Sequence, residues 1–430
     1  MKTLLLLVCL GVVCSCKPKE EVEIGPKGEI VSKPPLWASA INNGPNMASG
    51  VLSSIIFDGK KVVCPGGGLP YIPPIGNFSR GTINMIDIET GKIQWNWKDY
   101  IKSNDALHLN FSYKKDNRLV ISNGELTYCV DLQTGQSAWK KIKRDGITTN
   151  TIITGIGNSY FFCGDTYSKE QQQWVGAVYR GNVLAPEPEE LIVSPTLPKE
   201  LPDGSSGISA GATSLLAFEQ AGDTMLVIDH HTPSLPANQG IIRSVFGLYN
   251  VTKRKWIYEK MPIVTSYNAS VDGLPVIYNG RVYHSAGRHF TCHDLATGAK
   301  VWERTFGGNF LFSGFIIADG IIVANSEDTY IYGLDPATGS ERWQEKSSGT
   351  STRLVYQDGV VYYAGGGDGL LHAVDVQTGK HLWKLQSPDF RTNSDAYFWG
   401  MVAGLPAQNG KKGRIFASTG LNVYCYEAVK

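Results

Sequence analysis

The chain has 430 residues, with 40 basic and 39 acidic side chains and a formal net charge of +1. This balance argues against nucleic acid or anionic lipid as the main partner, because both are recognised through clustered positive charge. The longest basic cluster, at 140–144, is assigned to a solvated outer strand and its connector.

The N-terminus has the layout of a bacterial lipoprotein signal. Lys2 precedes an apolar stretch at 4–13, and residues 13–16, Val-Cys-Ser-Cys, resemble a lipobox. We therefore expect a signal peptide at 1–15 and a palmitate-type acyl anchor on Cys16, with plain secretion after cleavage as the alternative. The apolar stretch is too short for a persistent membrane span, which needs about 18 apolar residues. The Lys/Glu-rich segment that follows resembles surface-export signals, so we expect a periplasmic or surface-exposed protein on the outer membrane.

A unit of about 40 residues repeats along the rest of the chain, and each clear copy ends in an Asp-x-x-Thr-Gly turn followed by tryptophan. The copies share these positions: Asp87, Gly91, Trp95; Asp131, Gly135, Trp139; Asp294, Gly298, Trp302; Asp335, Gly339, Trp343; Asp375, Gly379, Trp383. Asn250 and Trp256 are interpreted as a further copy with two residues deleted. Upstream of most copies an Asn-Gly or Asp-Gly pair separates two β-branched runs, which is typical of a tight hairpin.

Each unit reads as four antiparallel strands, and the pattern predicts an all-β, eight-bladed β-propeller. In chain order the blades are expected at 51–97, 105–142, 150–193, 212–258, 272–304, 312–345, 352–385 and 398–428. The last unit has three evident strands, so we expect residues 34–41, with Trp37 in the tryptophan role, to close the ring. The predicted organisation is signal peptide 1–15, flexible tether 16–30 and propeller 31–430. A seven-bladed ring with 150–193 looped out is the alternative.

The stretch Ala373 to Trp383 matches the repeat AxDxxTGKxxW at every specified position. It resembles the tryptophan-docking motif of the pyrroloquinoline-quinone (PQQ) dehydrogenase propellers and of the BamB lipoproteins, which carry no quinone. The resemblance implies the fold and leaves the activity open, because propellers serve many unrelated functions. The sequence has neither an adjacent cysteine pair in the mature chain nor the large insertions of the dehydrogenases, so we expect no cofactor.

The cysteines and histidines are predicted to be structural. Five widely spaced cysteines after Cys16 do not form a disulfide framework, and we expect buried thiols between blades. His293, His372 and His381 lie on predicted strands. His230 and His231 open a long loop, where a metal site would need partners that the sequence does not reveal. No metal is expected.

Long loops joining second to third strands, and fourth strands to the next blade, should emerge on one face of the ring. Aromatic and arginine side chains dominate binding hot spots, so these loops form the candidate binding face: Tyr71, Phe78, Arg80, Trp174, His230, His231, Arg391, Tyr397 and Trp399.

No catalytic constellation stands out from the turn acids, so we predict a non-catalytic, membrane-anchored, monomeric scaffold for an envelope protein. Assistance to outer-membrane protein assembly, with β-barrel assembly components as partners, is its most concrete form. The alternatives are a small-ligand or glycan receptor and, third, a degenerate PQQ-dependent dehydrogenase.

Overall fold

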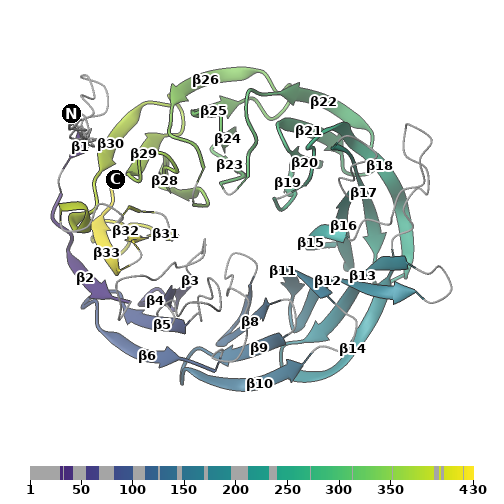
Figure 1. The fold of residues 1–430 in the computed structure, drawn as a ribbon, viewed down its shortest axis with the longest axis horizontal. Helices are drawn as coiled ribbons and strands as arrows, with labels where there is room; N and C mark the ends of the chain where they lie inside the picture. Colours follow the sequence, from purple (N-terminus) through teal and green to yellow (C-terminus); the bar gives the residue numbers. More distant parts are fainter. Residues whose placement is uncertain are drawn as a thin grey trace, which may run out of the picture.

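The computed structural model describes residues 30–31, 33–41, 55–66, 82–99, 112–123, 126–142, 148–168, 173–194, 212–231, 240–271, 273–311, 313–350, 352–391, 397–398, 401–419 and 421–430. They form eight antiparallel sheets arranged around an axis as a closed ring (Figure 1). The all-β, eight-bladed propeller is thus confirmed, and the seven-bladed alternative is wrong because 148–193 forms a complete blade. Among the described residues there is no helix with the length and hydrophobicity needed to cross a membrane.

Each blade is numbered in chain order, and its strands run from the axis outward. Blades 1 and 2 contain β3 (Ile55–Phe57), β4 (Lys61–Gly66), β5 (Thr82–Asp87), β6 (Ile93–Trp97), β7 (Tyr113–Lys115), β8 (Arg118–Asn123), β9 (Leu126–Asp131) and β10 (Gln136–Ile142). Blades 3 and 4 contain β11 (Thr148–Ile156), β12 (Ser159–Ser168), β13 (Gln173–Asn182), β14 (Ala185–Val193), β15 (Ala212–Gln220), β16 (Asp223–His231), β17 (Ile241–Asn250) and β18 (Lys255–Tyr267). The strands of these two blades are the longest, with 9 to 13 residues.

The remaining blades have short strands of regular length. Blades 5 and 6 contain β19 (Val276–Tyr278), β20 (Arg281–Ala286), β21 (His289–Asp294), β22 (Lys300–Thr305), β23 (Phe315–Ala318), β24 (Ile321–Asn325), β25 (Tyr330–Leu334) and β26 (Glu341–Lys346). Blades 7 and 8 contain β27 (Val355–Gln357), β28 (Val360–Ala364), β29 (Leu371–Asp375), β30 (His381–Leu385), β31 (Met401–Leu405), β32 (Arg414–Ser418) and β33 (Asn422–Glu427). A 3-10 helix, η3 (Pro388–Arg391), follows β30.

The ring is closed by the N-terminal segment, as the sequence predicted. Strand β2 (Trp37–Ala40) pairs antiparallel with β33, with Trp37 opposite Cys425, and becomes the outer strand of blade 8. Figure 1 shows purple β2 beside yellow β33, so segments near the two ends of the described chain lie next to each other. Just before it, β1 (Ile30–Val31) pairs in parallel with β30 and adds a fifth strand to blade 7. The N-terminal segment therefore covers two blade edges in succession.

Tryptophan side chains join consecutive blades. Each indole Nε1 donates to the carbonyl that follows the turn Asp or Asn of the next blade: Trp37 to Ile88 (2.7 Å), Trp95 to Leu132 (3.2 Å), Trp139 to Val183 (2.8 Å), Trp302 to Pro336 (3.1 Å) and Trp343 to Val376 (2.9 Å). The turn aspartate holds this carbonyl in place, because Asp87 Oδ1 accepts hydrogen bonds from the N–H groups of Glu89 and Thr90. The repeat residues thus serve packing between blades.

Blade 4 uses tyrosine in place of tryptophan, and the assignment of Trp256 to this role was wrong. Tyr258 keeps the offset of eight residues from Asn250, and its hydroxyl donates to the carbonyl of Leu295 at 2.9 Å. Trp256 packs instead against Gly247 of its own blade, where an added Cβ would lie 2.6 Å from the indole. Blade 4 therefore has no two-residue deletion between Asn250 and its docking residue, which is Tyr258 where the other copies have tryptophan.

The five cysteines that the structure describes form no disulfide and are buried, as predicted. Cys129 lies at the junction of blades 2 and 3, with its Sγ 3.6 Å from the carbonyl of Val183. Cys292 and Cys425 belong to apolar clusters that span two blades. Each thiol fills space between sheets that approach closely, which is a packing role.

A pair of glycine substitutions separates docking from backbone strain. Gly339 and Gly280 both have φ of +71°, but an added Cβ lies 2.7 Å from Trp302 at Gly339 and meets no heavy atom within 4 Å at Gly280. We expect Gly280→Ala to lower the free energy of unfolding by about 1 to 2 kcal/mol through backbone strain alone. Gly339→Ala should cost about 1 to 3 kcal/mol more, because the indole must move. Equal losses in urea unfolding would show that the indole contact contributes nothing.

Candidate functional site

The ring has two chemically different faces. The turn face carries the tight hairpins between first and second strands and the Asp-x-x-Thr-Gly turns. The loop face carries the loops between second and third strands and the connections to the next blade, because strands alternate in direction within a blade. The candidate binding residues were predicted on the loop face.

Much of that predicted set lies outside the described residues, namely Tyr71, Phe78, Arg80 and Trp399. Trp174 lies in β13 and Arg391 in η3, and the structure describes the backbone at both positions. Tyr397 is half-buried and packs over the loop 365–369, whose Gly369 has φ of +65°. Tyr397 therefore remains a candidate for the loop face.

His230 is wrong as a binding-face residue, because its side chain is 0% exposed inside blade 4. Burial lowers its pKa from 6.5 to about 3, which keeps the imidazole neutral. The preceding Asp229 accepts a hydrogen bond at 3.1 Å from His284 Nδ1 of blade 5, and both side chains are 0% exposed. An Asp–His pair could serve as a general base, but this one is sealed from any substrate. His231 is half-buried at the end of β16.

A second buried chain of polar groups crosses blade 7. Asp368 Oδ2 lies 3.1 Å from His372 Nε2, and His372 Nδ1 lies 3.1 Å from His381 Nε2. Burial, reinforced by the neighbouring His372, lowers the pKa of His381 to about 3. A neutral His381 can donate to His372, which in turn donates to Asp368. The histidines predicted as structural, His293, His372 and His381, are all buried in this way.

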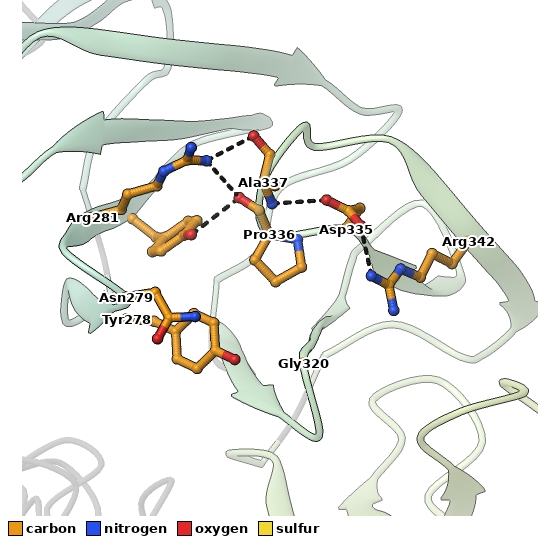
Figure 2. Close-up of a pocket in the computed structure, with 9 residues that line it drawn as sticks. Tyr278, Asn279, Arg281, Gly320, Asp335, Pro336, Ala337 and Arg342 are labelled. Carbon is orange, nitrogen blue, oxygen red and sulfur yellow. Dashed lines mark hydrogen bonds and ion pairs between the residues drawn. The ribbon is translucent and has the colours of Figure 1, made fainter.

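A polar pocket of about 340 Å³ lies on the turn face between blades 5 and 6 (Figure 2). Arg281 Nη1 donates to the carbonyl of Ala337 at 2.7 Å, and the hydroxyl of Tyr283 donates to Pro336 at 3.0 Å. Arg342 donates to Asp335 at 2.6 Å and lowers the pKa of that carboxyl. Figure 2 shows Arg281 pointing at the turn of blade 6, with Tyr278 and Asn279 on the same blade 5 side of the pocket and Arg342 beside Asp335 on the other side.

This turn-face pocket follows from blade docking. Pro336 is also the acceptor for Trp302, so Arg281 and Tyr283 add to the same contact. Arg414 makes the corresponding contact at the ring closure, where it donates to Ile88, the acceptor for Trp37, at 2.6 Å. The pocket is therefore a junction between blades.

A second pocket, of about 280 Å³, lies at the inner rim of the ring and is lined from four successive blades. Its wall contains Leu216 from β15, residues 273–276 leading into β19, residues 314–315 leading into β23, and Arg353. Leu216, Leu274, Gly314 and Arg353 each precede the positive-φ residue of their inner hairpin by five positions, so they lie at one level of the ring. We call this the axial pocket.

Arg353 is the functional candidate that the sequence analysis missed, since it placed arginines only on outer loops. Alignment of the blades on their inner hairpins would have found it. The position five residues before the hairpin holds Ser53, Phe111, Leu216, Leu274 and Gly314 in other blades, and arginine in blade 7. Burial lowers the pKa of the guanidinium from its ordinary value, and it stays protonated.

Two groups are considered as ligands for these residues, a metal ion and the quinone PQQ. Among the described residues no set of three or more His, Cys, Asp or Glu side chains is placed to hold a metal ion. PQQ is a planar tricarboxylate and needs several cationic or hydrogen-bonding partners. The axial pocket offers Arg353 among mainly apolar described neighbours, which does not fit such a group.

Comparison with known proteins agrees with the repeat pattern. Residues 255–430 match the family model described as outer membrane protein assembly factor BamB. Comparison with curated protein sequences gives no match.

Solved structures with the same fold have different functions. BamB from Moraxella catarrhalis is 11% identical and aligns with a TM-score of 0.52 over 88% of this chain and 95% of its own. A quinohemoprotein alcohol dehydrogenase from Pseudomonas putida is 10% identical, with a TM-score of 0.63 over 93% of this chain and 78% of its own. The computationally designed Ika8 protein is 13% identical, with a TM-score of 0.55 over 90% of this chain and 99% of its own. At these identities the likeness concerns the fold, and the chain is an eight-bladed propeller of PQQ-like repeats.

Proposed function

We propose that this chain is a non-catalytic lipoprotein of the outer membrane that acts as a protein-interaction scaffold in outer-membrane protein assembly, in the manner of BamB. The observation that carries the proposal is the match of 255–430 to the BamB family model; this range contains the four-stranded sheets of blades 5 to 7, three of the four strands of blade 8 and the outer strand of blade 4. The repeat residues that resemble those of the quinone enzymes are engaged in docking between blades.

The strand edges support a monomer with a specific partner surface on one face. Outer strands β22 and β26 carry alternating charges, such as Lys300 with Glu303, whose side chains pair at 2.7 Å. Charged edge strands resist pairing with a second chain. The long strands of blades 3 and 4 break the eightfold regularity of the ring, so these blades are the place where we expect an envelope partner to bind.

The anchor can be tested with one substitution. Two or more acyl chains on Cys16 would hold the protein stably at the membrane. Cys16→Ser removes the thiol that would be acylated, so the protein should move from the membrane fraction to the soluble fraction. Cys64→Ser, at a buried cysteine within blade 1, is the matched control and should stay with the membrane. Membrane retention of the Cys16→Ser protein would contradict the anchor.

The partner class requires a separate experiment. The acylated chain, captured with crosslinking from its native membrane, should bring down β-barrel assembly components. Retention on immobilised glycans without these components would instead favour the receptor alternative.

A small-ligand receptor is the second candidate function, favoured by the axial pocket. A quinoprotein dehydrogenase is the third. Its support is the shared fold with an alcohol dehydrogenase at 10% identity, and the lining of the axial pocket does not suit the quinone.

A further inference from the structure

We infer that the turn-face pocket between blades 5 and 6 binds the side-chain carboxylate of a glutamate supplied by a protein partner, with Arg281 as the group that receives it. The site deepens the proposed scaffold function and rests on it for the partner, while its preference for a carboxylate is measured separately. It adds a contact on the turn face to the one expected on blades 3 and 4.

The junction that closes the ring shows how such a carboxylate is bound. Arg414 is the first residue of β32, and its Nη1 donates to the carbonyl of Ile88 at 2.6 Å. Its Nη2 donates to one carboxylate oxygen of Glu89 at 2.7 Å, and Lys411 donates to the other at 3.2 Å. These two cations lower the pKa of Glu89. The guanidinium of Arg414 therefore binds a backbone carbonyl and a glutamate at the same time.

The junction of blades 5 and 6 has the same parts without the glutamate. Arg281 is likewise the first residue of a second strand, β20, and its Nη1 donates to the carbonyls of Pro336 and Ala337. Pro336 follows the turn aspartate, as Ile88 does, and both carbonyls also accept from a docking tryptophan. Ala337 stands where blade 1 has Glu89, two residues after the turn aspartate. A methyl group thus replaces the side chain that would meet the guanidinium.

The two turns share one backbone geometry. The N–H of Glu89 donates to Asp87 Oδ1 at 3.1 Å, and the N–H of Ala337 donates to Asp335 Oδ1 at 2.8 Å. The glycines that end the two turns have φ of +70° and +71°. Side chains at positions 89 and 337 therefore leave the backbone in corresponding directions, each towards the arginine of the preceding blade.

The guanidinium of Arg281 forms no ion pair within the described part of the chain. Asp294 is its partner in the neighbouring strand, but Asp294 Oδ1 accepts from the N–H and the hydroxyl of Thr297 at 2.9 and 2.8 Å. The equivalent residues of blade 2, Arg118 and Asp131, do pair, at 3.2 Å. Carbonyl oxygens hold Arg281 in place without neutralising its charge, so a carboxylate can bind to it as Glu89 binds to the arginine of blade 8.

The pocket supplies the space and the charge that a glutamate side chain needs. Its volume is about 340 Å³, with Tyr278 and Asn279 on the blade 5 side and Arg342 on the blade 6 side (Figure 2). Arg342 pairs with Asp335 at 2.6 Å, so these two charges offset each other and Arg281 gives the described lining a net charge of about +1. The Tyr278 hydroxyl and the Asn279 amide offer hydrogen-bonding groups to a peptide backbone. This lining favours a carboxylate over a phosphate, which carries more charge.

Exchanging alanine and glutamate between the two junctions tests the site. Ala337→Glu supplies the glutamate from within the chain and should fill the pocket, whereas Glu89→Ala should open the equivalent pocket at the ring closure. Arg281→Gln removes the cation. Ala296→Glu is the matched control, because Ala296 is the equivalent exposed residue of blade 5 and the strand position that faces its turn from blade 4 holds Asp223 in place of arginine.

The probe is N-acetyl-L-glutamate α-amide, titrated against the purified full chain and followed by ligand-observed NMR. The glutamine analogue tests the charge, and propionate tests whether the peptide groups contribute. We expect saturable binding of the glutamate probe, with the glutamine analogue and propionate each about tenfold weaker or more.

Arg281→Gln and Ala337→Glu should each weaken binding of the glutamate probe by about tenfold or more, and Ala296→Glu should bind it like the parent. Adding Glu89→Ala to Ala337→Glu should restore binding, now at the ring closure. Equal binding of the glutamate and glutamine probes, or unchanged binding by Ala337→Glu, would overturn the carboxylate site. Equal binding of propionate would overturn the assignment to a peptide glutamate in favour of a free small carboxylate.

The partner is tested with a purified β-barrel assembly complex. The parent chain should bind this complex more tightly than Ala337→Glu does, and Ala296→Glu should bind it like the parent. Equal binding of the parent and Ala337→Glu contradicts the turn-face contact alone. Failure of the parent to bind contradicts the scaffold function and leaves the result with the glutamate probe unaffected.

Discussion

Trp37→Ala is expected to lower the free energy of unfolding by about 3 to 5 kcal/mol, as for a large aromatic removed from a packed site. Trp37 is the contact by which the N-terminal strand closes the ring. Its Nε1 donates to Ile88 at 2.7 Å, and its ring lies 5.9 Å from that of Phe416. It also covers Gly91, so its removal exposes the junction of blades 8 and 1.

Guanidinium unfolding followed by circular dichroism measures this loss. Leu36→Ala is the matched control, because Leu36 precedes Trp37 and is 54% exposed; it should change the free energy of unfolding by less than about 0.5 kcal/mol. Similar values for the two variants would mean that residues 37–40 are an appendage and that the ring is held closed by other contacts.

Acidification from pH 6.5 towards pH 4 is expected to destabilise the protein steeply. His230, His293 and His381 have ordinary pKa values of 6.5, and burial lowers each to about 3, with neighbouring histidines adding to the effect. In this window the unfolded chain binds protons that the folded chain excludes. Their contribution to stability is therefore present above pH 6.5 and is lost as the pH falls.

The expected slope is about 1.4 kcal/mol per pH unit for each histidine, or about 4 kcal/mol per pH unit for three. Chemical unfolding at a series of pH values gives this slope directly. His293→Gln should reduce this slope by the contribution of one histidine, about 1.4 kcal/mol per pH unit, because glutamine does not titrate. The glutamine side chain can still donate to the carbonyl of Gly298, which lies 3.2 Å from His293 Nδ1. A flat stability profile between pH 6.5 and 4 would show that the buried imidazoles take up protons without cost.

The features that the sequence predicted well are those that recur in it. The Asp-x-x-Thr-Gly turns and the tryptophan docking contacts occur in several blades, so each copy supports the same interpretation. The closing strand at 34–41 was predicted because the last copy lacks its outer strand. The assignment failed in blade 4, where Tyr258 takes the role of tryptophan. In blade 3, for which the sequence suggested no docking residue, Glu190 stands at the docking position and pairs with Arg254 of blade 4.

The site was harder to predict than the fold. His230 and His231 are adjacent in the sequence, but the pleat of β16 directs them to opposite faces of the sheet; His230 is fully buried and His231 is half-buried. The axial pocket is lined by residues at the same height, on or just before the inner strands of four blades, and these residues lie far apart in the sequence. Arg353 becomes visible as a wall residue only when those strands are placed around the axis.

The measurement that tests the scaffold function most directly is the binding of the purified chain to a purified β-barrel assembly complex in detergent, followed by size-exclusion chromatography and biolayer interferometry. The account predicts co-elution and saturable binding, with Arg353→Gln binding like the parent because the axial pocket is separate. The parent chain should also show no PQQ-dependent oxidation of alcohols or sugars. Separate elution of the two components, together with saturable PQQ binding and dye-linked alcohol oxidation, would contradict the scaffold and establish the enzyme in its place.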